Sequence, residues 1–172
     1  MRFAGLAYRA HGPRWSFKPL SGEGAATHGG RFNPKGMPAL YLALDPMTAI
    51  KEAAQGFARK FEPLVLCTYE IDCADVVDCR TEDDRRAAGV EIADMASAWF
   101  AEAAAGRDPA SWRLAKRLLG EGATGVIGPN FVNSATSDDV NLTLWRWSDR
   151  LPHRAIVHDP SGRLPKSQLS WD

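Results

Sequence analysis

The sequence lacks most of the short signatures that identify an enzyme class. It contains no GxxxxGK[ST] phosphate loop, no HExxH zinc motif and no GxSxG nucleophile elbow. The run GEGAAT approaches a dinucleotide fingerprint, but Thr27 stands where the third glycine should be and no strand precedes the run. Phosphate-loop, zinc-protease, serine-hydrolase and Rossmann chemistry are therefore not indicated.

The chain is also poor in cysteine, in net charge and in long apolar runs. Cys67, Cys73 and Cys79 stand six residues apart, which matches no common zinc spacing, and their odd number argues against a disulfide framework. The formal net charge of zero gives no overall attraction to nucleic acid or to an anionic membrane. No run approaches the ~20 apolar residues of a membrane span, and the N-terminus has no signal-peptide core. We therefore expect a cytoplasmic protein that holds no metal and contacts neither nucleic acid nor membrane.

The 172 residues fit one α+β domain, because strands and helices do not alternate as a repeated βαβ array. Hydrophobic periodicity predicts strands at 4–9, 40–44, 64–71, 125–128, 141–147 and 154–159, and helices at 46 to about 58, 91–105 and 111–120. Asp45 can cap the first of these helices, with Pro46 at its first position. The Gly-rich stretch 11–38 is predicted to be a long irregular segment, which inside a compact domain is usually functional or mobile.

Three residue types in the first third of the chain suit the binding of a phosphorylated, aromatic ligand. Arg9 and Arg31 each offer a planar guanidinium that can hold phosphate oxygens. Tyr41, in the strand LYLAL, offers a flat face for stacking. Glu52 projects off the apolar stripe of the following helix, at ~100° per residue. A surface arginine, a packed strand tyrosine and a solvated helix glutamate explain the same pattern, so the pattern alone leaves both interpretations open.

Longer motifs carry a resemblance to a known family. The phrase GGRFNPKGMPALYLA, followed by AIKEAA, closely resembles the RES-domain family, which is named after arginine, glutamate and serine. AYRA resembles the family's first strand, and GATGVIGPN with DDVNLTLWRW its later segment, so the resemblance runs from about residue 5 to 147. It implies one RES domain over residues 1–172, with a fold like that of ADP-ribosyltransferases: a split mixed β-core surrounded by helices.

The resemblance also implies a site. Arg31 and Glu52 match the family's arginine and glutamate, and Tyr41 matches its tyrosine; these three are the candidate catalytic residues. Arg9 matches the first-strand arginine, and Arg9, Arg31 and Tyr41 would bind NAD⁺. The family's serine usually follows a proline, but Pro129 is followed by Asn130. Asn130, Ser134 and Ser137 therefore remain open as its replacement.

The implied activity is that of a toxin from a bacterial toxin–antitoxin pair, which consumes NAD⁺ as substrate. We expect it to cleave the nicotinamide–ribose bond and to pass ADP-ribose to a protein side chain, causing growth arrest. A protein is the expected acceptor because the Gly-rich segment 11–38 is long enough to form part of a protein-recognition surface. NAD⁺ degradation by hydrolysis or phosphorolysis is the alternative, and a non-catalytic binding module is a further one. The implied partner is a cognate antitoxin with an Xre-like helix-turn-helix domain that blocks the NAD⁺ cleft.

Overall fold

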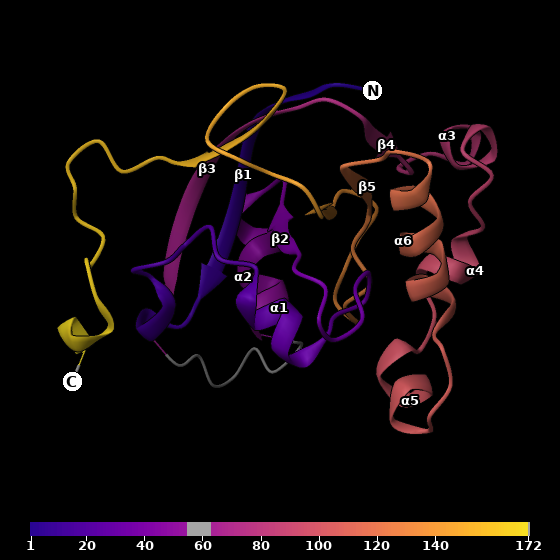
Figure 1. Ribbon diagram of the computed structural model, residues 1–172, viewed down its shortest axis with the longest axis horizontal. Helices are drawn as coiled ribbons and strands as arrows, with labels where there is room; N and C mark the ends of the chain where they lie inside the picture. The colour runs from indigo at the N-terminus through magenta and orange to yellow at the C-terminus, as the bar shows by residue number, and fades with distance from the viewer. Residues whose placement is uncertain (55–62, 172) are drawn as a thin grey trace.

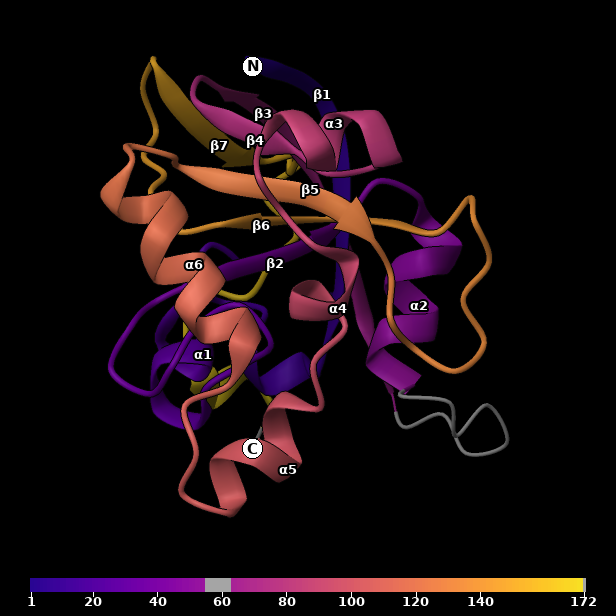
Figure 2. The same ribbon diagram turned by 90° about the vertical axis from the view of Figure 1, so that its right-hand side faces the viewer.

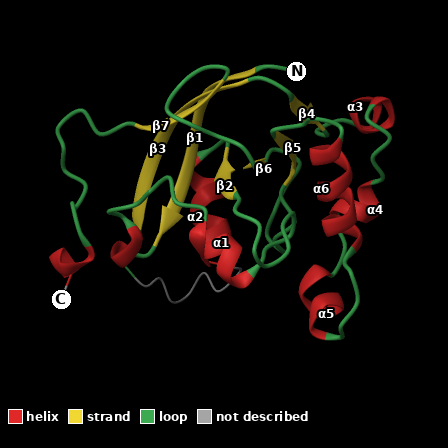
Figure 3. Ribbon diagram, in the orientation of Figure 1, coloured by secondary structure: helices red, strands yellow, loops and turns green. Residues whose placement is uncertain are grey.

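A computed structural model describes residues 1–54 and 63–171. It contains a seven-stranded mixed sheet in the order β4-β5-β6-β2-β1-β3-β7, with helices around it (Figure 1; Figure 3). The strands are β1 (Phe3–His11), β2 (Leu40–Ala43), β3 (Val65–Cys73), β4 (Val76–Asp78), β5 (Gly125–Pro129), β6 (Val140–Leu144) and β7 (His153–Val157). The helices are α1 (Glu23–His28), α2 (Pro46–Ala54), α3 (Glu82–Ala87), α4 (Ile92–Met95), α5 (Trp99–Ala104) and α6 (Ala110–Gly120), with 3-10 turns at Pro13–Trp15 and Gln168–Trp171. The predicted α+β domain with a mixed sheet surrounded by helices is confirmed.

The sheet has two halves that meet at a narrow junction. β1 pairs with β3 along its whole length, but its register with β2 is the one residue pair Tyr8–Ala43. Figure 2 shows β2, β5 and β6 running across the view while β1 rises steeply behind them. Strand β4 is parallel to β5, and the other neighbouring strands are antiparallel. The junction is the structural form of the split core that the resemblance implied.

Each face of the sheet has its own core. On one face, Leu40, Tyr69 and other buried strand residues pack under Leu20, Trp147 and Leu164, which come from loops and the C-terminal segment. On the other face, α4 and α6 cover β5 and β6 (Figure 2), and α2 packs against β1, β2 and β3. No helix within the described ranges is long and apolar enough to cross a membrane.

The segment 91–105 differs from the predicted single helix. It forms two short helices, α4 and α5, on either side of the buried Ser97. Met95 is buried as its spacing predicted, whereas Phe100 is 72% exposed and belongs to no core. The break coincides with a tertiary contact: the main-chain carbonyls of Met95 and Ser97 accept hydrogen bonds from Arg31. Tertiary contacts commonly override local helix propensity.

The Gly-rich stretch 11–38 is also more regular than predicted, since it contains helix α1. Helix α2 begins as predicted: Asp45 Oδ1 accepts from the main-chain N–H groups of Met47 and Thr48, at 2.8 and 3.2 Å. The predicted extension of this helix over residues 55–58 lies outside the described residues.

The carboxylate of Asp139 fastens α2 to the start of β6. It accepts hydrogen bonds from Thr48 Oγ1 at 2.6 Å, from Lys51 Nζ at 2.8 Å and from the main-chain N–H of Thr136 at 2.7 Å. These donors stabilise the charged form and hold the pKa of Asp139 well below its usual range. The orientation of α2 relative to β6 therefore depends on an ionised Asp139.

We expect Asp139→Asn to lower the free energy of unfolding by about 2–3 kcal/mol at pH 7, because charge-assisted hydrogen bonds are lost. A depressed folded-state pKa contributes stability that is present above the unfolded value of ~3.9 and is lost as pH falls below it. The acid limb of the stability curve should therefore flatten in the variant. Urea unfolding between pH 7 and pH 3 measures both effects.

Asp138→Asn is the matched control, because Asp138 is the exposed neighbour on the same loop. Equal stability of the Asp139 and Asp138 variants at pH 7 would contradict a stabilising role of the Asp139 hydrogen bonds.

Candidate functional site

The hydroxyl of Tyr41 anchors the loop that precedes β2. It donates to Asn33 Oδ1 at 2.7 Å and accepts from the main-chain N–H of Phe32 at 2.9 Å. Asn33 is fully buried, and its Nδ2 donates to the carbonyls of Ala25, Pro34 and Met37. Burial raises the pKa of Tyr41 far above its ordinary value, so the hydroxyl stays protonated. The hydroxyl therefore holds the loop before β2 in place. The stacking role predicted for the Tyr41 ring stays a prediction.

Arg31 extends from this anchored loop into a pocket of carbonyls and an aromatic ring. Its Nη1 donates to the carbonyls of Met95 and Ser97, at 3.1 and 2.9 Å. The guanidinium carbon lies 4.7 Å from the centroid of the Phe131 ring, a cation–π contact. Burial lowers the pKa of Arg31 and the charge of Glu52 raises it. Since free arginine titrates above ~12, the side chain remains a cation.

Glu52 lies on α2, close enough to Arg31 for the two charges to interact. Its carboxylate is half-buried and accepts a hydrogen bond from Nδ2 of Asn141 on β6. Burial raises the pKa of Glu52, while the Asn141 hydrogen bond and the charge of Arg31 lower it. Arg31 and Glu52 thus act on each other electrostatically, yet within the described chain no hydrogen bond joins them.

The structure therefore brings Arg31, Tyr41 and Glu52 together from a loop, a strand and a helix. Asn130, the residue after β5, is 6% exposed and belongs to the same face of the sheet. Its Oδ1 accepts from the main-chain N–H of Val132 at 2.7 Å. Ser134 and Ser137 are exposed on the loop that follows.

Arg9 lies on the opposite face of the sheet from the other candidates. Tyr8 pairs with Ala43, two residues from Tyr41, so Tyr8 shares the face of Tyr41 and the next residue points the other way. The Nη1 of Arg9 donates to the carbonyls of Ser21 and Pro19, at 3.3 and 3.4 Å. NAD⁺ binding by Arg9 stays a prediction, and this placement gives it no support.

Sequence reasoning missed Asn33 and Asn141, which hold Tyr41 and Glu52. A signal for Asn141 was available: it is a polar residue within the strand VNLTL, between residues that predict a buried sheet. Phe131 was also missed, because the contact of its ring with Arg31 joins segments a hundred residues apart.

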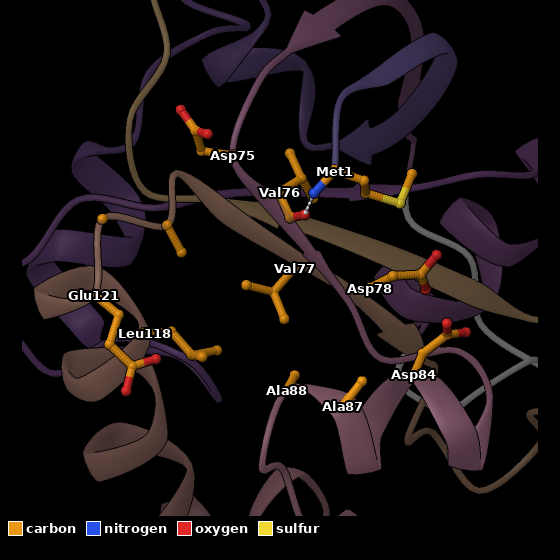
Figure 4. A pocket seen from close by; sticks show the side chains of 12 residues that line it. Met1, Asp75, Val76, Val77, Asp78, Asp84, Ala87, Ala88, Leu118 and Glu121 are labelled. Atoms are coloured by element: carbon orange, nitrogen blue, oxygen red, sulfur yellow. Dashed lines mark hydrogen bonds between the residues drawn. The ribbon is translucent and has the colours of Figure 1, made fainter.

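A separate hollow of about 540 Å³ lies between β4, α3 and α6 (Figure 4). Its lining includes Asp75, Asp78, Asp84 and Glu121, and none of the candidate residues. Carboxylates repel an anionic dinucleotide, so this hollow does not suit NAD⁺. Among the described residues, no three His, Cys, Asp or Glu side chains are grouped as metal ligands.

Comparison with known proteins gives three findings. The sequence profile of the RES domain family matches residues 6–167. Proteins named NAD(+) phosphorylase MbcT, from Mycobacterium bovis and Mycobacterium tuberculosis, are 36% identical over 85 residues; the match covers 44% of this chain and 46% of theirs. The crystal structure of the M. tuberculosis MbcT–MbcA toxin–antitoxin complex matches with a TM-score of 0.58 and 25% identity, over 91% of this chain and 85% of that one. The chain thus aligns with about half the length of the curated relatives.

Gly30 tests the anchored loop without altering a candidate residue. A Cβ added there would lie 2.5 Å from the Tyr41 hydroxyl and 2.7 Å from Asn33 Oδ1. We expect Gly30→Ala to lower the free energy of unfolding by about 1–3 kcal/mol through overpacking, as measured by urea titration. Gly24→Ala is the control, because a Cβ at Gly24 of α1 meets nothing within 4 Å. A Gly30 variant as stable as the Gly24 variant would show that the loop yields easily.

Proposed function

The chain belongs to the RES domain family, and on that premise we propose that it is an NAD⁺-consuming toxin that cleaves the nicotinamide–ribose bond. The observation that carries the proposal is the arrangement of Glu52 and Arg31. Both charges are half-buried on one face of the sheet, and they interact without being bonded to each other. The name of the curated relatives supports NAD⁺ as the substrate.

Glu52 suits the electrostatic demand of this reaction. Positive charge develops on the ribose as the nicotinamide bond breaks, as in glycoside chemistry. A fixed carboxylate beside that charge stabilises the transition state, and a half-buried one acts through less solvent than an exposed one. The hydrogen bond from Asn141 holds one carboxylate oxygen in place. Nicotinamide leaves as a neutral molecule, so no general acid is required.

Arg31 suits the diphosphate of the same substrate. Its Nη1 is used by the carbonyls of Met95 and Ser97, which fix the side chain. Within residues 1–54 and 63–171, no protein group accepts from its Nε or Nη2. Two parallel N–H donors on one edge of a guanidinium match two phosphate oxygens. Arg31 would thereby hold the dinucleotide while Glu52 faces its ribose.

Inorganic phosphate is the acceptor we propose. In that reaction a phosphate oxygen forms a bond to the ribose C1 as the bond from C1 to the nicotinamide nitrogen breaks. The bonding electrons pass to the ring nitrogen, and the products are neutral nicotinamide and ADP-ribose 1-phosphate. The support is the name of the relatives, NAD(+) phosphorylase.

A protein acceptor, which we expected from the sequence, has weaker support. That expectation relied on residues 11–38 as a recognition surface. In the structure, carbonyls of this segment accept hydrogen bonds from three tryptophan side chains of the same chain: Leu20 from Trp147, Gly30 from Trp112 and Phe32 from Trp145. These three carbonyls are therefore paired within the chain itself and are not offered to a protein partner. ADP-ribose transfer to a protein remains the second candidate.

Asn130 is the residue that we propose in place of the family's serine. It is buried at the end of β5, on the face of Glu52 and Tyr41, whereas Ser134 and Ser137 are exposed. An amide can donate and accept hydrogen bonds, as a hydroxyl can.

We also propose a cognate antitoxin with an Xre-like helix-turn-helix domain that covers the Arg31–Glu52 site. The match to a toxin–antitoxin complex supports such a partner. Expression of this chain alone should arrest bacterial growth, and co-expression of the antitoxin encoded beside it should restore growth. Arrest that persists with that neighbour, or no arrest by the chain alone, would contradict the pairing.

Activity should depend on Glu52 and on phosphate. We expect Glu52→Gln to lower kcat by about 10²–10³-fold, the usual effect of removing one preorganised electrostatic group. Because burial raises the pKa of Glu52, wild-type activity should fall as pH drops through that raised value. Mass spectrometry of purified protein with NAD⁺, with and without inorganic phosphate, measures nicotinamide and ADP-ribose 1-phosphate.

Glu91→Gln, at an exposed position before α4, is the matched control. Wild-type activity of the Glu52 variant would contradict the role of Glu52. Nicotinamide release that does not depend on phosphate would favour hydrolysis.

A further inference from the structure

Among the described residues, two buried amide atoms on the Tyr41 face of the sheet have no protein partner. Asn130 Nδ2 is a donor without an acceptor, and Asn141 Oδ1 is an acceptor without a donor, within the part of the chain that the structure describes. The other end of each amide is occupied: Asn130 Oδ1 accepts from Val132, and Asn141 Nδ2 donates to Glu52. These hydrogen bonds determine which atom of each amide is the oxygen, and so which atom has no partner. Buried polar groups without partners are rare, because each costs free energy in the folded state.

Asn141 lies in β6 and Asn130 directly follows the adjacent strand β5, and both side chains belong to one face of the sheet. Asn141 pairs with Gly128, and the ladder continues with the main-chain N–H of Asn130 bonded to the carbonyl of Asp139. Asn130 and Asn141 are therefore diagonal neighbours, with side chains roughly 7 Å apart at their bases. The strand neighbours of Asn141 on this face are Ala43 and Gly128, which carry one side-chain carbon and none. Neither neighbour can satisfy Asn141 Oδ1.

We propose that Asn130 Nδ2 and Asn141 Oδ1 bind the carboxamide of the nicotinamide ring, the first donating to its oxygen and the second accepting from its nitrogen. The inference rests on the proposed function. A primary carboxamide is neutral and presents one acceptor and two donors on adjacent atoms. One protein donor beside one protein acceptor complements it.

Other parts of the dinucleotide fit the pair less well. Phosphate oxygens are acceptors, so they would leave Asn141 Oδ1 unpaired. The adenine edge also offers a donor beside an acceptor, but adenine lies at the far end of the dinucleotide from the bond that Glu52 faces. The ribose hydroxyls next to that bond would face the Glu52 carboxylate, which can itself accept hydrogen bonds from them. The carboxamide alone is both near the reacting bond and matched to the pair.

Asn141 would then link two events in one side chain. Its Nδ2 orients the carboxylate that stabilises the ribose cation, and its Oδ1 holds the leaving group. A nicotinamide held at its carboxamide cannot rotate about its bond to the ribose, so the breaking bond keeps one direction relative to Glu52. Asn130 and Asn141 thus act as specificity-determining residues for the amide.

The test of Asn141 compares two substrates on two proteins. The 3-acetylpyridine analogue of NAD⁺ keeps the carbonyl and replaces the amide nitrogen by methyl, so it has no donor for Asn141 Oδ1. We expect Asn141→Ala to lower kcat/KM for NAD⁺ about 5–10-fold more than for the analogue, the effect of one neutral hydrogen bond. The comparison divides the loss of kcat/KM on NAD⁺ by the loss on the analogue. The lost Glu52 contact affects both substrates and the leaving-group reactivity affects both proteins, so both effects cancel. Equal losses on the two substrates would overturn the assignment of Asn141.

Asn130→Asp provides a second test that keeps local structure. The variant retains an oxygen for the Val132 N–H and replaces the donor Nδ2 by a carboxylate oxygen. We expect kcat/KM to fall at least about 10-fold on both substrates, mainly through KM, because both keep the carbonyl. Asn133→Asp, an exposed site on the same loop, is the control, and urea unfolding verifies that each variant is folded.

Kinetics of Asn130→Asp equal to those of the control would overturn the pair. Wild-type protein inert towards NAD⁺ would instead contradict the proposed function, so the two failures are distinguishable.

Discussion

The hydrogen bonds of one hydroxyl determine where the candidate site lies. Tyr41 is held in β2, and its oxygen bonds the main chain of Phe32 and the side chain of Asn33. A buried hydroxyl is stable only when it is paired, so the loop before β2 must follow the position of the tyrosine. Arg31 stands between the bonded residues Gly30 and Phe32, and its reach to the carbonyls of Met95 and Ser97 starts from this fixed backbone. The position of the cation thus depends on a neutral side chain.

The site forms where the two halves of the sheet meet. The junction Tyr8–Ala43 adjoins Asn141 across β2 and β6, and α2 crosses the same region. Asp139 contacts α2 at Lys51, which is the residue before Glu52. The Lys51–Asp139 contact and the Asn141–Glu52 hydrogen bond both join α2 to the β6 region. The helix is therefore fixed at two points around the Glu52 carboxylate. Rigid support of this kind is what a preorganised site requires.

The sequence predicted the elements whose causes are local. The cap of α2 follows from Asp45 and Pro46, and the buried strands follow from apolar runs. The sequence also allowed the face of Arg9 to be predicted, because consecutive strand residues alternate and Arg9 follows Tyr8. The division between α4 and α5 could not be predicted in this way, because it coincides with hydrogen bonds from the distant Arg31 to the carbonyls of Met95 and Ser97. For Asn141 the sequence signals only a polar residue in a buried strand, and its partner Glu52 could not be predicted because it is distant in the chain.

Lys51 and Glu52 are neighbours on α2, and each has an oppositely charged partner elsewhere in the chain. One pair is in direct contact and the other is not. Lys51 and Asp139 are in direct contact at 2.8 Å, and the donors around Asp139 leave it no role except to hold the helix. Glu52 and Arg31 influence each other's pKa but are bonded to Asn141 and to carbonyls instead. A direct ion pair would use the donors of Arg31 and the oxygens of Glu52, and would leave no edge for a ligand. Keeping two half-buried charges apart costs stability, and this cost supports the proposal that Arg31 and Glu52 bind a charged substrate.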